Sequence, residues 1–191
     1  VTTPSEDILT LPEAFLITDT RADHFALELE SVLYQVNENA ILGIRLEDPE
    51  GDLVQDTVQV ELRVESPLAA AGVVFQDGGL SGQAILDDGV GISGWLGNGG
   101  EAWVVLSSTV PDELTLTVRG LGEDAYVREE ERTVLFTAGD AEQVQIHLPT
   151  GGFSATAGEP FNVIMELLDA GGNLVEDRPS DLWLVESCGD F

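Results

Sequence analysis

Apolar and polar residues alternate along this chain with a period of two, not with the period of 3.6 that a helix requires. Phe25, Leu27 and Leu29 are separated by polar residues or alanine. The same alternation recurs at 58–64, 114–118 and 144–148. Successive side chains of a strand point to opposite faces of its sheet, so this pattern predicts half-buried antiparallel strands.

Denser apolar runs at 40–46, 102–106, 134–136 and 163–168 are typical of strands inside a two-sheet core. Turn residues rich in Gly, Asp, Asn and Pro separate the runs. No segment has a convincing amphipathic helical pattern. The predicted strands of the central region cover 22–36 with a break in the middle, 40–48, 57–65, 72–76, 83–87, 101–108, 113–119 and 131–137.

The chain also repeats itself. Residues 40–56 (AILGIRLEDPEGDLVQD) match residues 161–177 (FNVIMELLDAGGNLVED). A second match aligns 13–29 with 132–148. Both matches imply a period of roughly 120 residues, which is the size of a domain and not of a solenoid repeat.

This period divides the chain into three parts. Residues 1–20 would be the terminal strand of a preceding module, 21–138 a complete module, and 139–191 the first strands of a following module. Seven or eight strands in about 115 residues is the size of an immunoglobulin-like sandwich. We therefore expect an all-β fold of tandem immunoglobulin-like antiparallel β-sandwiches, one complete and two partial.

Residues 153–177 resemble the opening of bacterial Ig-like domains of the invasin/intimin type. In those domains an apolar strand ends in Asp-x-x-Gly-Asn, followed by an apolar residue and Val, as in the stretch Asp169–Val175. The first copy departs from this pattern, because Asp52 replaces the Asn. The resemblance implies a non-catalytic, extracellular tandem array in adhesins and surface proteins, with no catalytic residues to carry over.

The composition is strongly acidic. The chain has 36 Asp and Glu residues, seven basic residues that are all Arg, and a net charge of −29. Such a surface repels phosphate backbones and anionic lipids, so we expect no nucleic-acid partner and no direct membrane insertion of this segment. The absence of Lys suits a salty or calcium-rich exterior, or reflects only a biased genome and a soluble surface. The single cysteine, Cys188, excludes an internal disulfide and is expected to be a small buried hydrophobe.

One turn has the spacing of a calcium loop. Asp48, Glu50 and Asp52 place three carboxylates at alternate positions, and Ca²⁺ takes six to eight oxygen ligands. The matching turn in the second copy keeps only Asp169, and no acidic residue lies near Gln59 to complete an EF-hand. A solvated hairpin turn is the favoured interpretation, with Ca²⁺ as the one cofactor that the pattern suggests.

Two further motifs have a chemical interpretation. Trp95 is the one candidate for a carbohydrate platform, although a core or packing role is expected for it. The GxGxxG pattern at 89–94 would need a following helix to bind a dinucleotide. The WLGNGG that comes directly after it breaks helices, so a loop is expected there. We predict no catalytic residues, and His24 and His147 lie near no nucleophile motif.

The chain is therefore predicted to be a non-catalytic structural or adhesive repeat segment of a secreted, cell-surface protein, stalk or filament. The alternative is an accessory calcium- or carbohydrate-binding module of a secreted enzyme. Partial sandwiches leave sheet edges and an apolar face uncovered. Either the natural chain continues beyond these 191 residues, or identical subunits supply the missing strands by strand complementation.

Overall fold

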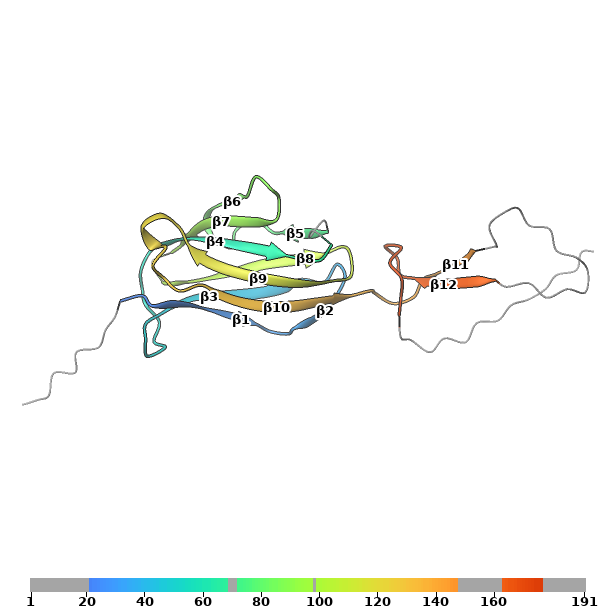
Figure 1. The fold of residues 1–191 in the computed structure, drawn as a ribbon, viewed down its shortest axis with the longest axis horizontal. Coiled ribbons are helices and arrows are strands. Elements are labelled where there is room, and N and C mark those ends of the chain that lie inside the picture. Colours follow the sequence, from blue (N-terminus) through green and yellow to red (C-terminus); the bar gives the residue numbers. More distant parts are fainter. Residues whose placement is uncertain (1–20, 69–71, 98, 148–162, 177–191) are drawn as a thin grey trace, which may run out of the picture.

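The computed structural model describes residues 21–68, 72–97, 99–147 and 163–176. These residues form twelve strands and one short 3₁₀ turn, with no α-helix among them. The first ten strands build two packed sheets, and the last two form a separate hairpin beyond one end of the sandwich (Figure 1). The predicted all-β fold is confirmed. No described helix is long and apolar enough to cross a membrane.

The two sheets of the sandwich contain four and six strands. The four-stranded sheet has, in spatial order, β1 (His24–Leu29), β3 (Ala40–Glu47), β8 (Glu101–Ser108) and β5 (Val73–Phe75). The six-stranded sheet has β2 (Leu33–Gln35), β10 (Glu130–Thr137), β9 (Asp112–Gly120), β4 (Val58–Glu65), β7 (Gly91–Leu96) and β6 (Ser81–Ile85). The hairpin consists of β11 (Gln143–His147) and β12 (Ile164–Leu168), and the 3₁₀ turn η1 spans Gly122–Asp124.

The break predicted inside the first strand is a change of sheet. β1 pairs with β3, whereas β2 crosses to the other sheet and pairs with β10, where Leu33 lies opposite Leu135. This second pairing is parallel, which corrects the expectation of purely antiparallel sheets. The chain keeps its direction while it passes from one sheet to the other, so β2 runs alongside β10 in the same sense.

β7 was not predicted, and the expectation of a loop at 89–94 is wrong from Gly91 onward. Ile92 and Leu96 are fully buried, and β7 lies between β4 and β6. Glycines hide this strand in the sequence because they weaken the β signal. They are needed for close packing: a Cβ on Gly91 would collide with the backbone oxygen of Leu62. The second and third glycines of the motif, Gly91 and Gly94, lie within a strand and no α-helix follows in the described part of the chain, so the motif is not a dinucleotide loop.

The core lies between the two sheets and is filled by the alternating apolar residues. Phe25 from β1 and Phe136 from β10 are fully buried, and the ring of Phe136 stacks on Tyr34 with a centroid distance of 5.7 Å. Leu62, which the repeat aligns with Trp183, is also fully buried. Trp183, Cys188 and the strand predicted within 1–20 lie outside the described residues.

We expect Phe136→Ala to destabilise the sandwich by about 3–5 kcal/mol, because it leaves a cavity between the sheets. Leu135→Ala is the matched control, since Leu135 is the adjacent residue on β10 and its side chain is partly exposed on the outer face. Urea unfolding followed by tryptophan fluorescence measures both. Equal losses in the two variants would contradict this position of the core.

Candidate functional site at the module junction

The hairpin β11–β12 repeats the pairing of β1 with β3. In the sandwich Phe25 lies opposite Leu46, and in the hairpin Val144 lies opposite Leu167. The first strand thus recurs 119 residues later and the second 121 residues later. Residues that lie opposite each other in the sandwich therefore have counterparts that lie opposite each other in the hairpin. The repeat seen in the sequence is therefore also a repeat of strand pairing.

The turn after β3 is organised by a buried carboxylate. Asp48 is only 4% exposed, and its Oδ1 accepts hydrogen bonds from the backbone N–H of Glu50 at 3.1 Å and of Asp52 at 2.8 Å. The Asp48 backbone N–H donates to the Asp52 carbonyl, which closes the turn. A side chain that accepts from nearby backbone groups in this way stabilises a turn without any ligand.

The turn after β12 repeats these bonds. Asp169 is 2% exposed, and its Oδ1 accepts the N–H groups of Gly171 and Asn173, each at 2.9 Å. Gly172 has a φ of 82°, a left-handed conformation that glycine adopts without strain, and Gly51 in the first turn has a φ of 88°. The aligned Asp and Gly positions of the two copies therefore have a common structural cause.

The second turn also contacts the sandwich. Asp169 Oδ2 accepts a hydrogen bond at 3.0 Å from the backbone N–H of Gly139, which lies between β10 and β11. Asn173 Nδ2 donates to Asp169 Oδ2 at 3.0 Å and to the carbonyl of Thr109, in the β8–β9 loop, at 3.3 Å. One buried carboxylate thus holds the hairpin turn, the connecting segment and the asparagine that reaches the sandwich. We call Thr109, Gly139, Asp169 and Asn173 the junction.

An open cavity of about 710 Å³ lies beside the junction. It separates the ends of β9 and β10 from the segment that follows the second turn. Its walls include Asp112, Leu135, Ala138, Leu174 and Val175.

Hydrogen bonding keeps Asp169 ionised despite its burial. Burial alone would raise the pKa of its carboxyl group. The hydrogen bonds from Asn173, Gly139 and Gly171 together outweigh burial and lower the pKa below its usual value. A charged acceptor makes shorter and stronger hydrogen bonds than a neutral one, so this state holds the junction best.

The calcium candidates Asp48, Glu50 and Asp52 lie together in the first turn, but the carboxylate of Asp48 is turned toward the backbone N–H groups of the other two. Within the described part of the chain, no group of three or more His, Cys, Asp or Glu side chains is placed to hold a metal ion. Calcium binding by these residues stays a prediction without structural support.

Trp95 lies on the outer face of the six-stranded sheet, between Gln59 of β4 and Ser81 of β6. Trp95 is 43% exposed, so a core role is wrong. A packing role is compatible with its position beside Gly82, where an added Cβ would lie 3.9 Å from the Trp95 ring. Saccharide binding at Trp95 stays a prediction. A second exposed tryptophan, Trp103 of β8, was not among the predicted site residues. Alternation would have revealed it, because Ala102 and Val104 on either side face the core.

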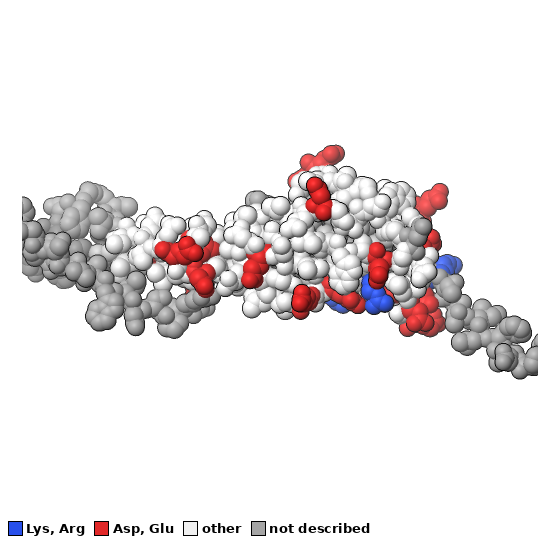
Figure 2. All heavy atoms as spheres, turned by 180° about the vertical axis from the view of Figure 1, so that it is seen from behind, with Lys and Arg blue, Asp and Glu red and all other residues white. Residues whose placement is uncertain are grey.

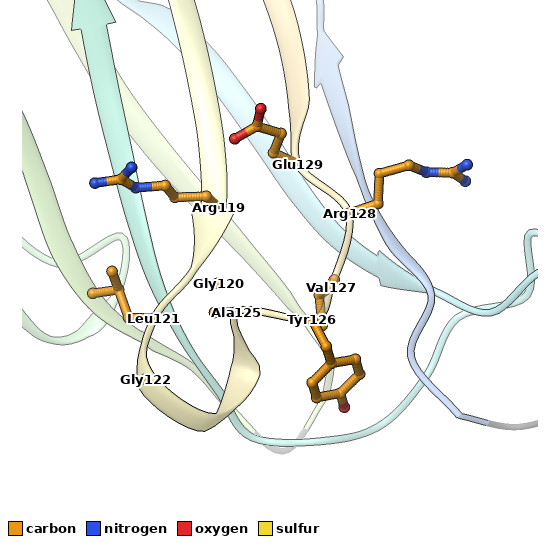
Figure 3. A pocket seen from close by; sticks show the side chains of 9 residues that line it. All are labelled: Arg119, Gly120, Leu121, Gly122, Ala125, Tyr126, Val127, Arg128 and Glu129. Atoms are coloured by element: carbon orange, nitrogen blue, oxygen red, sulfur yellow. The ribbon is translucent and has the colours of Figure 1, made fainter.

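A cavity of about 570 Å³ lies around the β9–β10 loop (Figure 3). Arg119 is paired with Glu61 at 2.8 Å and Arg128 with Asp23 at 2.9 Å. Their side chains point in opposite directions and Tyr126 points away from both (Figure 3). These groups do not converge on one point, as a binding or catalytic site would require.

Comparisons with known proteins give structural neighbours only. No family model matches the chain, and no curated protein matches it. A β-glycosidase from Bacteroides vulgatus is 16% identical over 60% of this chain and 14% of its own, with a TM-score of 0.44. The Escherichia coli adhesin FdeC is 14% identical over a match that covers 82% of this chain and 44% of FdeC, with a TM-score of 0.43. The Yersinia pseudotuberculosis adhesin InvE is 15% identical over a match that covers 61% of this chain and 33% of InvE, with a TM-score of 0.41.

The chain therefore spans less than half the length of each of these three neighbours. They include both adhesins and an enzyme. Their identities and TM-scores are too low to assign a function to this chain.

Substitution of Asp169 tests the junction. In Asp169→Ala we expect the Gly139 amide to exchange with solvent about tenfold faster, because a hydrogen bond to a charged acceptor is lost. Glu176→Ala is the control, since Glu176 is an exposed carboxylate on the same segment. Hydrogen exchange followed by NMR measures both, and unchanged protection of Gly139 in Asp169→Ala would contradict the assignment.

The lowered pKa of Asp169 also fixes the sign of a pH effect. Its stabilising contribution is fully present above the unfolded-state pKa of about 3.9 and is lost as the pH falls through the lower folded-state pKa. We expect the Gly139 amide shift to be constant from pH 7 to about 4 and to move only at lower pH. Asp169→Asn should remove this step, and a step centred well above pH 4 would show that the carboxylate is not held as described.

Proposed function

We propose that this chain is a non-catalytic segment of tandem Ig-like sandwiches in an extracellular surface protein that forms a stalk or filament. Residues 1–20, 21–138 and 139–191 are assigned to three successive modules. The observation that carries the proposal is the repetition of the β1–β3 pairing and its aspartate turn in β11–β12. A chain that begins the same sandwich twice is built as an array.

The hairpin supports this assignment because one of its faces needs a covering sheet. Val144, Ile146 and Met165 lie on that face and are partly or largely exposed. Their counterparts in the sandwich, Phe25, Leu27 and Ile44, are at most 3% exposed because the six-stranded sheet covers them. We propose that further strands of the same chain, or of an identical subunit, cover the face of the hairpin.

The junction supports a role in spacing the modules. Its hydrogen bonds tie the connecting segment at Gly139 and the loop at Thr109 to the second aspartate turn. The first aspartate turn follows Glu47, which pairs with His24 at the start of β1, so it lies at the opposite end of the sandwich. We propose that this first turn contacts the preceding module through the carboxylate of Asp48, as Asp169 contacts Gly139, which would propagate one relative orientation along the array. Asp52 replaces Asn173 and has no amide group to repeat the bond to Thr109.

The acidic, lysine-free composition and the resemblance to bacterial Ig-like domains of the invasin/intimin type support the extracellular location. A net charge of −29 keeps neighbouring stalks apart by repulsion. The sandwich would then act by extending and presenting a surface.

Labelling of intact source cells tests this function. Antibodies raised against residues 21–138 should bind cells that have not been permeabilised, and external protease should remove the signal. An antibody to a cytoplasmic protein is the control for cell integrity. Peptide mapping of the native protein should also show further modules with a period of about 120 residues. Labelling only after lysis, or a catalytic domain beside this segment, would contradict the proposal.

A further inference from the structure

Trp103 lies across the outer face of the four-stranded sheet. It is the register partner of Gly43 on β3, and a Cβ on that glycine would come within 2.9 Å of the Trp103 ring. The ring therefore covers the glycine with one face, and the side chain is still 55% exposed. Glycine at position 43 lets the indole lie close to the backbone, which leaves its other face available for contact.

A cavity of about 370 Å³ adjoins this ring. It is lined by Leu29, Ile41 and Trp103 and by two carboxylate residues, Glu28 and Glu30. An aromatic and aliphatic wall beside carboxylates suits a group with an apolar stem and a positive head. Arginine and lysine side chains have this composition. A cation over the face of tryptophan is also attracted by the ring quadrupole.

The charges around the cavity are not balanced. Arg45 Nη1 contacts Glu28 Oε1 at 3.1 Å and Glu47 Oε1 at 3.4 Å. Glu30 makes no ion pair with another described residue. On the face seen in Figure 2, acidic side chains are spread over the surface and few arginines are in view. A positive partner would therefore be attracted to the cavity, and a second copy with a charge of −29 would be repelled.

We propose that the cavity beside Trp103 binds an arginine or lysine side chain presented by a basic protein partner. The methylene groups would pack against Ile41, because Leu29 lies opposite the buried Leu42 and packs against the core. The charged head would lie over the indole, and Glu30 would supply the counter-charge. Glu28 contributes less because Arg45 already pairs with it. This inference goes beyond the tandem array, since it concerns one face of a single sandwich.

Titration of the chain of residues 1–191 with acetyl-Gly-Arg-Gly-amide, followed by the indole N–H signals of the tryptophans, tests the site. We expect a saturable shift of the Trp103 signal, smaller shifts at higher salt, and no shift with the citrulline peptide, which has no charge. A shift that depends on protein concentration without peptide would indicate self-association and overturn the proposal.

Three variants test whether the cavity binds a cationic side chain and not a neutral ligand. Glu30→Gln should weaken binding about twofold to fivefold, as expected for an exposed charge pair. Trp103→Leu keeps an apolar cover over Gly43 and should weaken binding about fivefold. Because this variant lacks the Trp103 indole, its binding is followed by the backbone amide signal of Gly43. Trp95→Leu is the matched control, because Trp95 is an exposed tryptophan flanked by Gln59 and Ser81 instead of carboxylates. Unchanged binding in Glu30→Gln, or binding of neutral glycans alone on an array, would overturn the proposal.

Discussion

A buried carboxylate must receive hydrogen bonds, and this requirement governs the turns after β3 and β12. Asp48 and Asp169 are both removed from solvent, so each would be costly without partners. Backbone N–H groups of the following turn supply these partners and fix its shape. The second turn adds Gly139 as a further donor. The same interaction that closes a hairpin therefore also determines how one β-unit is attached to the next.

The sandwich and the hairpin show the same strand pairing in two environments. In the sandwich a second sheet covers the apolar side of β1 and β3, so that Phe25 and Ile44 are fully buried. In the hairpin, Val144 and Met165 occupy the equivalent positions and remain exposed. Hydrophobic burial contributes roughly 25 cal/mol for each Å² of apolar surface, so an uncovered face is unfavourable. This difference is the physical basis for treating the hairpin as the beginning of a module.

The two outer faces of the sandwich differ in chemistry although each carries an exposed tryptophan. Trp95 lies among polar residues on the six-stranded sheet. Trp103 lies beside carboxylates on the four-stranded sheet and covers Gly43. In the proposed tandem array the ends of a module are occupied by its neighbours, so these lateral faces would be left to meet a partner. Their side chains would decide what an array of such modules binds.

The sequence by itself determined the strands and the repeat, because both depend on local patterns. Alternation located β1 and β4, and a dense apolar run located β3, each to within a residue or two. The aligned Asp and Gly positions of the two copies marked both turns. Alternation failed at β7, where the glycines required for close packing lower the strand signal. Only the tertiary structure decided that β2 joins β10 in parallel, that Trp95 faces solvent, and that Asp169 binds Gly139. These features depend on groups far apart in the sequence, which no local pattern encodes.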